Sequence, residues 1–557
     1  MSIRISFLDG RTVECPFGTC AEMVLEQAGI DTLDTAALKV NNALLPLSAR
    51  LEVNATLTLV ALDSPEGMTV FRRSLAFLLA VAVRRSFPQL RLYIGHSLGN
   101  SYYYTFAEST TPPKEELSAL LTQLKAKMQA LVKADIPIRR SLLSYSEALL
   151  LFEQNRQIDT KLLFDERSES TVPVNICDDF VDLYVEPLVP KTGMIRTFDL
   201  MPYRHGFLLL FPGLGRGMSL DPFEDLPVIF SVYNEYKKWG QLMGVQAVGH
   251  LNRLVSQHRK VIKEYIGLSE AFQDKKLSEI ADQIYAKKDR LKIVLIAGPS
   301  SSGKTTTSKK LSIALKVLGI QPVSISLDDY YRGADHVPYD ENGEPDLECL
   351  EALDVPYLNE QLLALFRGEE VTLPDFDFKS SKRRETGKKK IRLSERTVLI
   401  LEGIHGLNDA LTPEIDPAFK FKLYISALTQ LNLDDHNRIP TSDNRLLRRI
   451  VRDYQFRGNS AAATIKMWPS VRRGEQKHIF PFQNGADAAF NSALTYELAV
   501  LKFYAEPLLH SVKPNVPEYA EAVRLLSFLE NFAPIPPQYV PGQSILREFI
   551  GESEFKY

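Results

Sequence analysis

Residues 292–319 read KIVLIAGPSSSGKTTTSKKLSIALKVLG. An apolar run of strand length leads into a loop that matches G-x-x-x-x-G-K-[ST] at every fixed position, and a helix-like stretch follows until Gly319. Glycines let such a loop curl so that its N–H groups point at phosphate oxygens, and the helix N-terminus adds partial positive charge. The sequence therefore predicts a phosphate-binding loop made of Gly298, Pro299, Ser300, Ser301, Ser302, Gly303, Lys304, Thr305 and Thr306.

The chain after residue 291 alternates between two patterns. Apolar runs of strand length, such as PVSISL at 322–327 and RTVLILEG at 396–403, are separated by stretches with helical periodicity. That alternation is typical of a parallel sheet with crossover helices. We therefore predict an α/β fold for residues 291–557.

Acidic side chains follow two of these predicted strands. Asp328 lies at the end of one, where the active-site crevice of a parallel sheet forms, and a carboxylate there can accept the proton of an attacking hydroxyl. Glu402 ends the other and occupies the position that holds Mg²⁺ together with the Thr305 hydroxyl, while Lys304 reaches the β- and γ-phosphates of ATP. The alternatives are helix-capping or solvated aspartates and a surface glutamate. The base-reading NKxD motif of GTPases does not occur.

An arginine-rich segment, NRLLRRIVRDYQFRG, spans residues 444–458. Its leucine, isoleucine and valine side chains mark one helix face, and Arg445, Arg448, Arg449 and Arg452 recur at helical spacing beside them. Such arginines form either a solvated helix face or a lid that closes over ATP and neutralises transition-state charge. We expect the lid.

Composition limits the classes of protein to consider. The chain has 557 residues, with 66 basic and 69 acidic side chains, so bulk charge does not favour nucleic acid. The basic stretch KSSKRRETGKKKIR at 379–392 either contacts RNA or, as we favour, forms a solvated loop. Four scattered cysteines and the lack of a membrane-length apolar run lead us to expect a cytoplasmic protein without membrane contact. We also expect a homo-oligomer.

The sequence divides into four predicted parts. Residues 1–62 show a strand–strand–helix–strand–strand order that is typical of a β-grasp fold, with a tight turn at Asp9-Gly10. Residues 63–245 mix helices and strands in an α+β pattern, and 246–290 form a charged helical connector. Residues 291–557 form the α/β part described above.

The α/β part resembles the uridine kinase and phosphoribulokinase group of P-loop kinases. The matching segments are GPSSSGKTT, SLDDYYR, FDFKSSKR, LEGIHGL and RLLRRIVRDYQFRG, in the family's order. The resemblance implies ATP and Mg²⁺ as cofactors and a nucleoside as acceptor. It implies Asp328 as catalytic base, Lys304, Arg449 and Arg452 as further catalytic groups, and Arg457 as a phosphate ligand. The residues that it implies at the acceptor are Asp328, Tyr331, Glu348, Phe376, Asp377, Phe378 and Arg449.

Two positions depart from the uridine kinase pattern. Phe376 replaces a tyrosine, and Ser381 replaces a histidine that helps to read the pyrimidine. A site that pairs with the polar edges of a base discriminates strongly, and these replacements remove two of the pairing groups. The base preference therefore stays open. Asn459 also replaces an arginine that is frequent in the family's lid.

The N-terminal half resembles a different family. Residues 1–62 resemble the TGS domain, and residues from 63 to about 210 resemble the editing domain of threonyl-tRNA synthetases, through RRSLAFLLAVAVRRSFP, YIGHSLGNSYYYTF, YSEALLLF and FVDLYVEPLVPKTG. The family's HxxxH pair falls on Phe77 and Val81, and its CxxxH pair falls on Tyr184 and Leu188. These side chains cannot act as base or metal ligand, so we predict no aminoacyl-tRNA hydrolysis.

Taken together, the patterns predict an ATP-dependent kinase that phosphorylates the 5′-hydroxyl of a nucleoside. A second hypothesis is an ATP-binding regulatory protein whose N-terminal domains contact RNA or tRNA. A third keeps the kinase but changes the acceptor to another small hydroxyl compound, such as a sugar phosphate or a pantothenate-like molecule.

Overall fold

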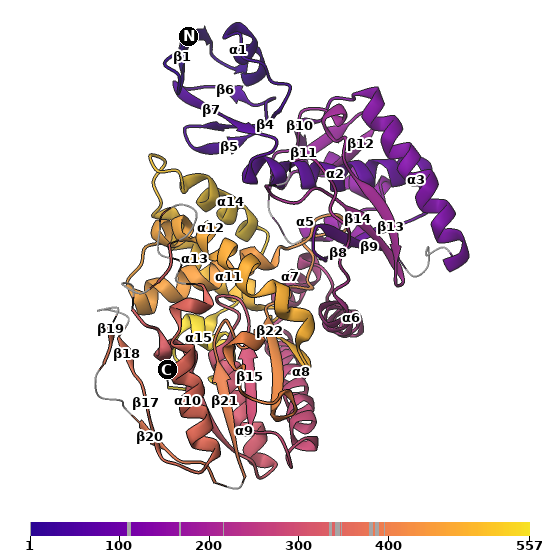
Figure 1. The fold of residues 1–557 in the computed structure, drawn as a ribbon. Helices are drawn as coiled ribbons and strands as arrows, with labels where there is room; N and C mark the ends of the chain where they lie inside the picture. The colour runs from indigo at the N-terminus through magenta and orange to yellow at the C-terminus, as the bar shows by residue number, and fades with distance from the viewer. Residues whose placement is uncertain are drawn as a thin grey trace.

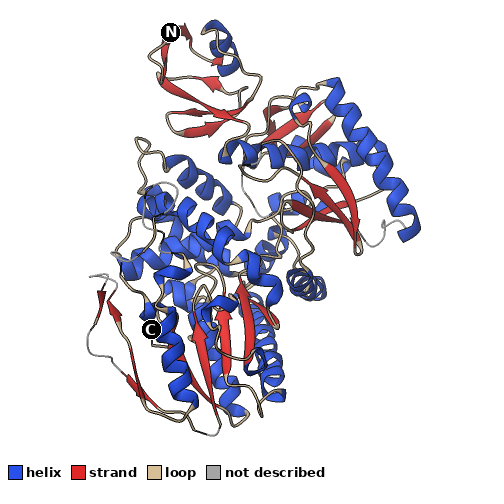
Figure 2. Cartoon of the chain, viewed as in Figure 1, coloured by secondary structure: helices blue, strands red, loops and turns tan. Residues whose placement is uncertain are grey.

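The computed structural model describes residues 2–107, 113–165, 167, 169–215, 217–333, 337–339, 343, 346, 348–377, 382–384, 389–394 and 396–556. Figure 1 shows a small N-terminal unit, a mixed middle unit beside it, and a larger C-terminal unit that contains both the orange strands and the yellow C-terminus. Figure 2 shows that helices surround the C-terminal sheet, whereas the N-terminal unit is mainly strands. The α/β class predicted for the C-terminal part is confirmed.

The N-terminal unit has the predicted β-grasp order. Its sheet runs β2-β1-β7-β4-β5, with β1 and β7 parallel and the other neighbours antiparallel. Gly10 turns the chain between the first two strands at φ 88°, which glycine adopts without a Cβ clash. The elements are β1 (Ser2–Phe7), β2 (Thr12–Pro16), β3 (Thr19–Cys20), α1 (Ala21–Gln27), β4 (Thr35–Val40), β5 (Ala43–Leu45), β6 (Arg50–Leu51) and β7 (Ala55–Ala61).

The middle unit packs two antiparallel sheets, β10-β11-β12 and β13-β14-β9-β8, around the long helix α2. Ser64 caps this helix by accepting a hydrogen bond from Gly67 N at 3.0 Å, and Pro65 begins it. The elements are α2 (Pro65–Ser86), β8 (Leu92–Ser97), β9 (Ser101–Phe106), α3 (Lys114–Ala134), β10 (Arg139–Ser144), α4 (Tyr145–Gln154), α5 (Ile158–Asp165), β11 (Thr171–Cys177), β12 (Phe180–Leu183), β13 (Asp199–Tyr203) and β14 (Gly206–Leu210).

Three helices lead from the middle unit to the C-terminal sheet: α6 (Pro227–Leu242), α7 (Val248–Gln257) and α8 (Arg259–Ala286). The longest, α8, does not stand alone in solvent. Its Ile280 and Ile284 side chains are buried in the same core as Leu311 and Leu315 of the helix that follows the phosphate-binding loop. The helical segment between the two halves therefore forms part of the hydrophobic core that supports the loop.

The C-terminal sheet has the order β16-β21-β15-β22-β23, and every neighbouring pair is parallel. All five residues of its central strand β15 are buried, as a strand covered on both faces requires. The elements are β15 (Ile293–Ala297), α9 (Lys304–Val317), β16 (Gln321–Ser326), α10 (Val355–Phe366), β17 (Val371–Leu373), β18 (Phe376–Asp377), β19 (Lys382–Arg383), β20 (Lys389–Ile391), β21 (Thr397–Glu402), β22 (Lys420–Ser426), α11 (Thr441–Arg452), α12 (Ala461–His478), β23 (Ala488–Asn491), α13 (Glu497–His510), α14 (Tyr519–Glu530) and α15 (Arg547–Ile550).

Buried ion pairs join the middle unit to the loop that follows β22. Arg91 pairs with Asp435 at 2.6 Å and with Asp159 at 3.1 Å. His436 Nδ1 lies 2.9 Å from a carboxylate oxygen of Asp182. Burial by itself lowers the pKa of His436, but the nearby aspartates outweigh it and raise that pKa to about 9. A charged histidine therefore lies between the two units.

A second set of ion pairs reaches the helix that carries the arginine-rich segment. Arg524 of α14 donates to Asp443, in the first turn of α11, at 2.6 Å and lies 3.4 Å from Glu186 of the middle unit. Glu186 also pairs with Arg73 of α2. The middle unit is thus connected through side chains to the N-terminal end of α11.

The His436–Asp182 pair makes stability depend on pH in a predictable direction. Because the folded-state pKa of about 9 exceeds the ordinary 6.5, its stabilising contribution is complete below pH about 6.5 and is lost as pH rises through 9. The free energy of unfolding of the wild type should therefore exceed that of His436→Gln by up to about 3 kcal/mol less at the upper pH than at the lower pH. Urea denaturation of both proteins at a series of pH values measures the difference. The exposed His205 provides a control, because His205→Gln should track the wild type at every pH. A constant gap between wild type and His436→Gln would contradict the assignment.

Candidate functional site

The phosphate-binding loop connects β15 to α9, as the sequence predicts. Lys304 is the first residue of α9, and Gly303 before it has φ 82°. Ser301 also has a positive φ, 58°, which a residue other than glycine adopts only at a cost in conformational energy. A Cβ on Gly298 would lie 2.1 Å from the carbonyl oxygen of Ile425, so the loop passes directly against β22. The loop therefore has a tightly constrained backbone at the carboxyl end of the sheet.

Two arginines of α11 hold the carbonyl groups of this loop. Arg445 Nε donates to Ser300 O at 2.9 Å, and Arg448 Nη1 donates to Ser301 O at 3.3 Å. Both side chains are buried, with at most 1% exposure, and each pairs with a buried glutamate: Arg445 with Glu475 and Arg448 with Glu497. Because these carbonyl groups are bound by the arginines, the loop N–H groups other than Ser300 N, which donates to Glu475, do not have to pair with them.

The burial of Arg445 and Arg448 corrects the expectation that α11 presents its whole arginine set as a lid. These two side chains also do not form a solvated face, which was the alternative. Their charges are compensated inside the protein by carboxylates from α12 and α13, elements that lie outside the arginine-rich segment. The remaining arginines of the segment, Arg449, Arg452 and Arg457, are more exposed than these two, and we call them the open-side arginines.

Those arginines gather around Asp453, whose side chain is fully buried. Arg452 Nη2 lies 2.8 Å from Asp453, Arg449 Nε lies 3.2 Å from it, and Arg457 Nε lies 3.7 Å from it. Arg449 also donates to Ser300 Oγ at 2.7 Å. Residues Asp453–Arg457 form a π-helical turn, a feature that is frequent at functional sites. The structure thus brings all three predicted arginines to one place beside the loop.

Lys304, Thr305 and Glu402 also meet. Lys304 Nζ donates to Gly298 O at 3.1 Å, and Thr305 Oγ1 donates to the Glu402 carboxylate at 3.3 Å. Burial raises the pKa of Glu402 to about 7; Lys304 lowers it, whereas Asp328 and Glu548 raise it further. A hydroxyl and a carboxylate are oxygen donors of the kind Mg²⁺ takes, with waters and phosphates completing the set. Among the described residues no group of three or more histidine, cysteine or acidic side chains forms a metal cage.

Asp328 lies in the short 3-10 helix Leu327–Tyr330, directly after β16. Its backbone N–H donates to Ser326 Oγ at 3.3 Å, which fixes the turn at the strand end. Although the side chain reaches solvent, surrounding protein atoms raise its pKa, while the charges of Lys304, Arg457 and Arg452 lower it. The charges of the loop lysine and of two open-side arginines therefore act on the Asp328 carboxylate.

Three further predicted residues lie around Asp328. Burial raises the pKa of Tyr331 well above its usual range, and the charges of Asp328 and Glu348 add to the rise. The rings of Tyr331 and Phe376 lie 5.8 Å apart between centroids. Glu348 has a raised pKa through burial and Glu475, which Arg449 and Lys304 oppose. Phe378 and the side chain of Asp377 lie outside the described residues.

Four acidic residues at this site were missed by sequence reasoning. Glu475 accepts a hydrogen bond from Ser300 N at 3.0 Å, Glu497 pairs with Arg448, Asp453 binds the open-side arginines, and Glu548 contacts Thr306. Only Asp453 had a local signal, because it follows Arg449 by four residues on one helical turn. The others come from distant segments, and no spacing in the sequence relates them to the loop.

Three of the four positions that align with the synthetase editing residues are buried in the middle unit, and Tyr184 is half-buried. Phe77 and Val81 of α2 are buried at 6% and 0% exposure, and Phe77 lies 5.5 Å from Phe180 between ring centroids. Leu188 is buried, and the guanidinium of Arg140 lies 4.5 Å from the ring of Tyr184. The absence of aminoacyl-tRNA hydrolysis stays a prediction.

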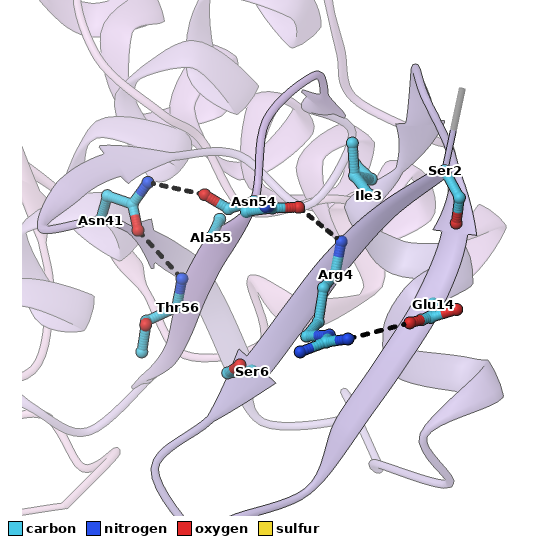
Figure 3. Close-up of a pocket in the computed structure, with 9 residues that line it drawn as sticks. All are labelled: Ser2, Ile3, Arg4, Ser6, Glu14, Asn41, Asn54, Ala55 and Thr56. Carbon is cyan, nitrogen blue, oxygen red and sulfur yellow. Dashed lines mark hydrogen bonds and ion pairs between the residues drawn. The ribbon is translucent and has the colours of Figure 1, made fainter.

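A polar hollow of about 530 Å³ lies on the β-grasp unit, far from the loop (Figures 1 and 3). Its side chains bind one another or the local backbone: Arg4 pairs with Glu14 at 3.4 Å, and Asn41 Oδ1 accepts from Thr56 N at 2.9 Å. The residues that line it are Ser2, Ile3, Arg4, Ser6, Glu14, Asn41, Asn54, Ala55 and Thr56. Its lining residues include no phosphate-binding loop and no cluster of arginines such as the one near Lys304.

Residues 293–499 match the model of the Phosphoribulokinase / Uridine kinase family. The N-terminal region is similar to threonine–tRNA ligases. The chain is 33% identical over 201 residues to the threonine–tRNA ligase of Symbiobacterium thermophilum, and the aligned region covers 36% of this chain and 30% of that ligase. The ligase of Acidithiobacillus ferrooxidans is 37% identical over 166 residues, and this region covers 29% of this chain and 25% of the ligase. The chain thus spans less than a third of the length of these relatives. Both resemblances predicted from the sequence are confirmed.

Two solved kinases align with part of the chain. A structure described as a "Possible Uridine Kinase" from Bacillus stearothermophilus is 21% identical, covers 39% of this chain and 98% of its own, and has a TM-score of 0.27. A D-glycerate 3-kinase from Cryptococcus neoformans is 16% identical, covers 46% and 87%, and has a TM-score of 0.23. In the described part of the chain, no helix has the length and apolar character that crossing a bilayer requires.

The contact between Gly298 and Ile425 gives a test of the loop geometry. A Cβ in Gly298→Ala would also lie 2.9 Å from Ser302 Oγ, so the loop or strand β22 must shift. Displacing the loop amides should weaken ATP binding at least about tenfold, because each lost tenfold corresponds to only ~1.4 kcal/mol. Calorimetric titration with ATP measures it. Gly267→Ala in α8 is the matched control: its added Cβ meets nothing within 4 Å, so binding should not change. Unimpaired binding by Gly298→Ala would refute the tight approach.

Proposed function

We propose that this chain is an ATP-dependent phosphotransferase that phosphorylates a small hydroxyl acceptor, namely the 5′-hydroxyl of a nucleoside. The observation that carries this proposal is the position of Asp328. Its carboxylate lies at the carboxyl end of β16 and interacts with the charges of Lys304, Arg452 and Arg457. A proton acceptor is therefore close to the groups that would hold a transferring phosphoryl group.

Asp328 would act as the general base of the transfer. Its raised pKa makes it a better proton acceptor than an ordinary aspartate, and the charges of Lys304, Arg457 and Arg452 favour its ionised form. The acceptor hydroxyl would lie between Asp328 and the loop, in line with the bond that breaks. The proton moves to Asp328 as the oxygen bonds to phosphorus, and the nucleoside diphosphate leaves toward the loop amides.

The cations of the site would stabilise the negative charge on the transferring group. Lys304 would move from the carbonyl oxygens of Gly298 and Pro299 to the β- and γ-phosphate oxygens. Arg449 and Arg452, held in place by Asp453, approach from the opposite side. When bound, Mg²⁺ would be held through Thr305 and Glu402 and would neutralise part of the phosphate charge. Preorganised cations of this kind lower the barrier without reorganising during the reaction.

The acceptor side supports a nucleoside more than a sugar phosphate. The rings of Tyr331 and Phe376 offer apolar surface next to Asp328, whereas Glu348 offers a carboxylate for a hydroxyl group. A second phosphate would meet the charges of Glu348 and Asp328 at this side. Glycerate, sugar and pantothenate-like acceptors remain the alternatives within the same reaction class.

A second candidate function rests on the N-terminal similarity to threonine–tRNA ligases. In that alternative the β-grasp and middle units bind RNA, and the phosphate-binding loop acts as an ATP-dependent switch. The contacts from Arg73 and Glu186 to Arg524 offer a physical route between the halves. This alternative predicts tRNA binding that depends on ATP and no turnover of small acceptors.

The decisive experiment compares Asp328→Asn with the wild type. Phosphate transfer from ATP is measured for uridine, cytidine, adenosine, guanosine, inosine, thymidine, ribose and pantothenate. We expect the wild type to phosphorylate at least one nucleoside, and Asp328→Asn to lose about 10²–10⁴-fold in kcat, the usual contribution of a general base. ATP binding should change little, because Asp328 makes no hydrogen bond to the loop among the described residues.

Asp329→Asn provides the matched control. Asp329 is the neighbouring carboxylate on the same turn; its charge raises the pKa of Tyr330, and it is not among the charges that act on Asp328, so activity should stay within a few-fold of the wild type. Equal turnover by Asp328→Asn and wild type would remove Asp328 from the mechanism. If no acceptor is turned over, tRNA binding with and without ATP tests the second candidate.

A further inference from the structure

The C-terminal helix α15 places a carboxylate on the N-terminal turn of the nucleotide-loop helix. Glu548 Oε2 accepts a hydrogen bond from Thr306 N at 3.0 Å and another from Thr306 Oγ1 at 2.6 Å. The two residues are 242 positions apart in the sequence. A carboxylate is stabilised at a helix N-terminus by the unpaired N–H groups and the helix dipole.

The position of this carboxylate is one that phosphate would use. In a loop of this type the backbone N–H groups at the start of the helix cradle the α- and β-phosphates. Thr306 is the third residue of α9, and Glu548 takes both its N–H and its hydroxyl. A bound nucleotide and Glu548 therefore compete for the same donors, and both are negatively charged.

The backbone that carries Glu548 is firmly anchored. Arg547 donates to the carbonyl oxygens of Val540 at 2.7 Å and Pro537 at 3.1 Å, and Phe549 is fully buried. The guanidinium of Arg448, which holds the loop, lies 4.9 Å from the ring of Phe549. Among the four residues of α15, Glu548 alone is partly exposed. Its side chain can therefore leave Thr306 by rotating while α15 stays in place.

Glu475 provides an instructive contrast. It too accepts a hydrogen bond from a loop amide, Ser300 N, but the buried Arg445 compensates its charge. Glu548 bonds instead to the uncharged N–H and hydroxyl groups of Thr306, while its charge raises the pKa of Lys309 against the lowering effect of burial. Its charge also contributes to the raised pKa of Glu402. Glu475 thus has a buried arginine as a direct partner, whereas Glu548 places its negative charge directly on donors of the phosphate site.

We propose that Glu548 is an internal competitor for nucleotide phosphates, which lowers the affinity of the loop for ATP and ADP until its side chain leaves Thr306. The inference rests on the proposed function in taking the loop as the nucleotide site, but it does not depend on the acceptor. It adds a residue that determines nucleotide affinity and that lies outside the matched kinase segment, residues 293–499.

The test is Glu548→Gln. Glutamine keeps an oxygen that can accept from Thr306, so the fold is preserved, but it removes the charge. Calorimetry with ADP plus Mg²⁺, and separately with inorganic tripolyphosphate, should show about tenfold tighter binding of each than in the wild type. Glu548→Ala, which removes the acceptor as well, should bind at least as tightly. Tripolyphosphate is included because it reports the phosphate site without contributions from the base and ribose.

Glu552→Gln is the matched control. Glu552 follows on the same C-terminal segment, its side chain is 85% exposed, and it pairs with Arg547. Its variant should bind both probes like the wild type. Unchanged or weaker binding by Glu548→Gln would overturn the inference while leaving the kinase intact. If neither the wild type nor Glu548→Gln bound either probe, the nucleotide site and the proposed function would both be rejected.

Discussion

The phosphate-binding loop depends on the buried pairs between α11 and its neighbours. Loop amides can face a phosphate only if the loop carbonyls find donors on the other side, and Arg445 and Arg448 supply them. A guanidinium inside the protein needs a carboxylate, and Glu475 and Glu497 provide it. Removing one partner of such a pair costs about 3–5 kcal/mol, because the other charge stays buried. The pairs therefore fix where α11 lies relative to the loop.

This constraint extends across the whole chain. Glu475 comes from α12 and Glu497 from α13, while Phe549 of α15 lies beside Arg448. In its first turn α11 is held through Asp443 by Arg524, which also lies near Glu186 of the middle unit. The synthetase-like unit is thus connected, through Arg524 of α14, to the helix that holds the phosphate-binding loop. Phe77, Val81 and Leu188 of this unit are buried, and Arg73 and Glu186 take part in this contact.

Local patterns in the sequence were enough to predict the loop and the parallel sheet. The motif at 298–305 and the apolar run before it specify a strand, a turn and a helix within one short segment. Asp328 and Glu402 could be predicted because the carboxyl ends of parallel strands meet at one edge. Arg445 and Arg448 could not be separated from Arg449 and Arg452, since all four share helical spacing. Their different environments depend on glutamates that are 30 and 49 residues away.

The charges around the loop indicate why a nucleotide should arrive with a divalent cation. Burial raises the pKa of Asp328, Glu348 and Glu402, and Glu548 adds to the effect at Glu402. The cations that oppose these carboxylates are Lys304, Arg449, Arg452 and Arg457, of which the three arginines already share Asp453. Lys304 lowers the pKa of Glu402, and the charge of Glu402 also acts on Lys309, yet the pKa of Glu402 stays raised. A polyphosphate alone would add to the negative charge there, whereas Mg²⁺ between Thr305 and Glu402 would stabilise the ionised carboxylate and the phosphate together.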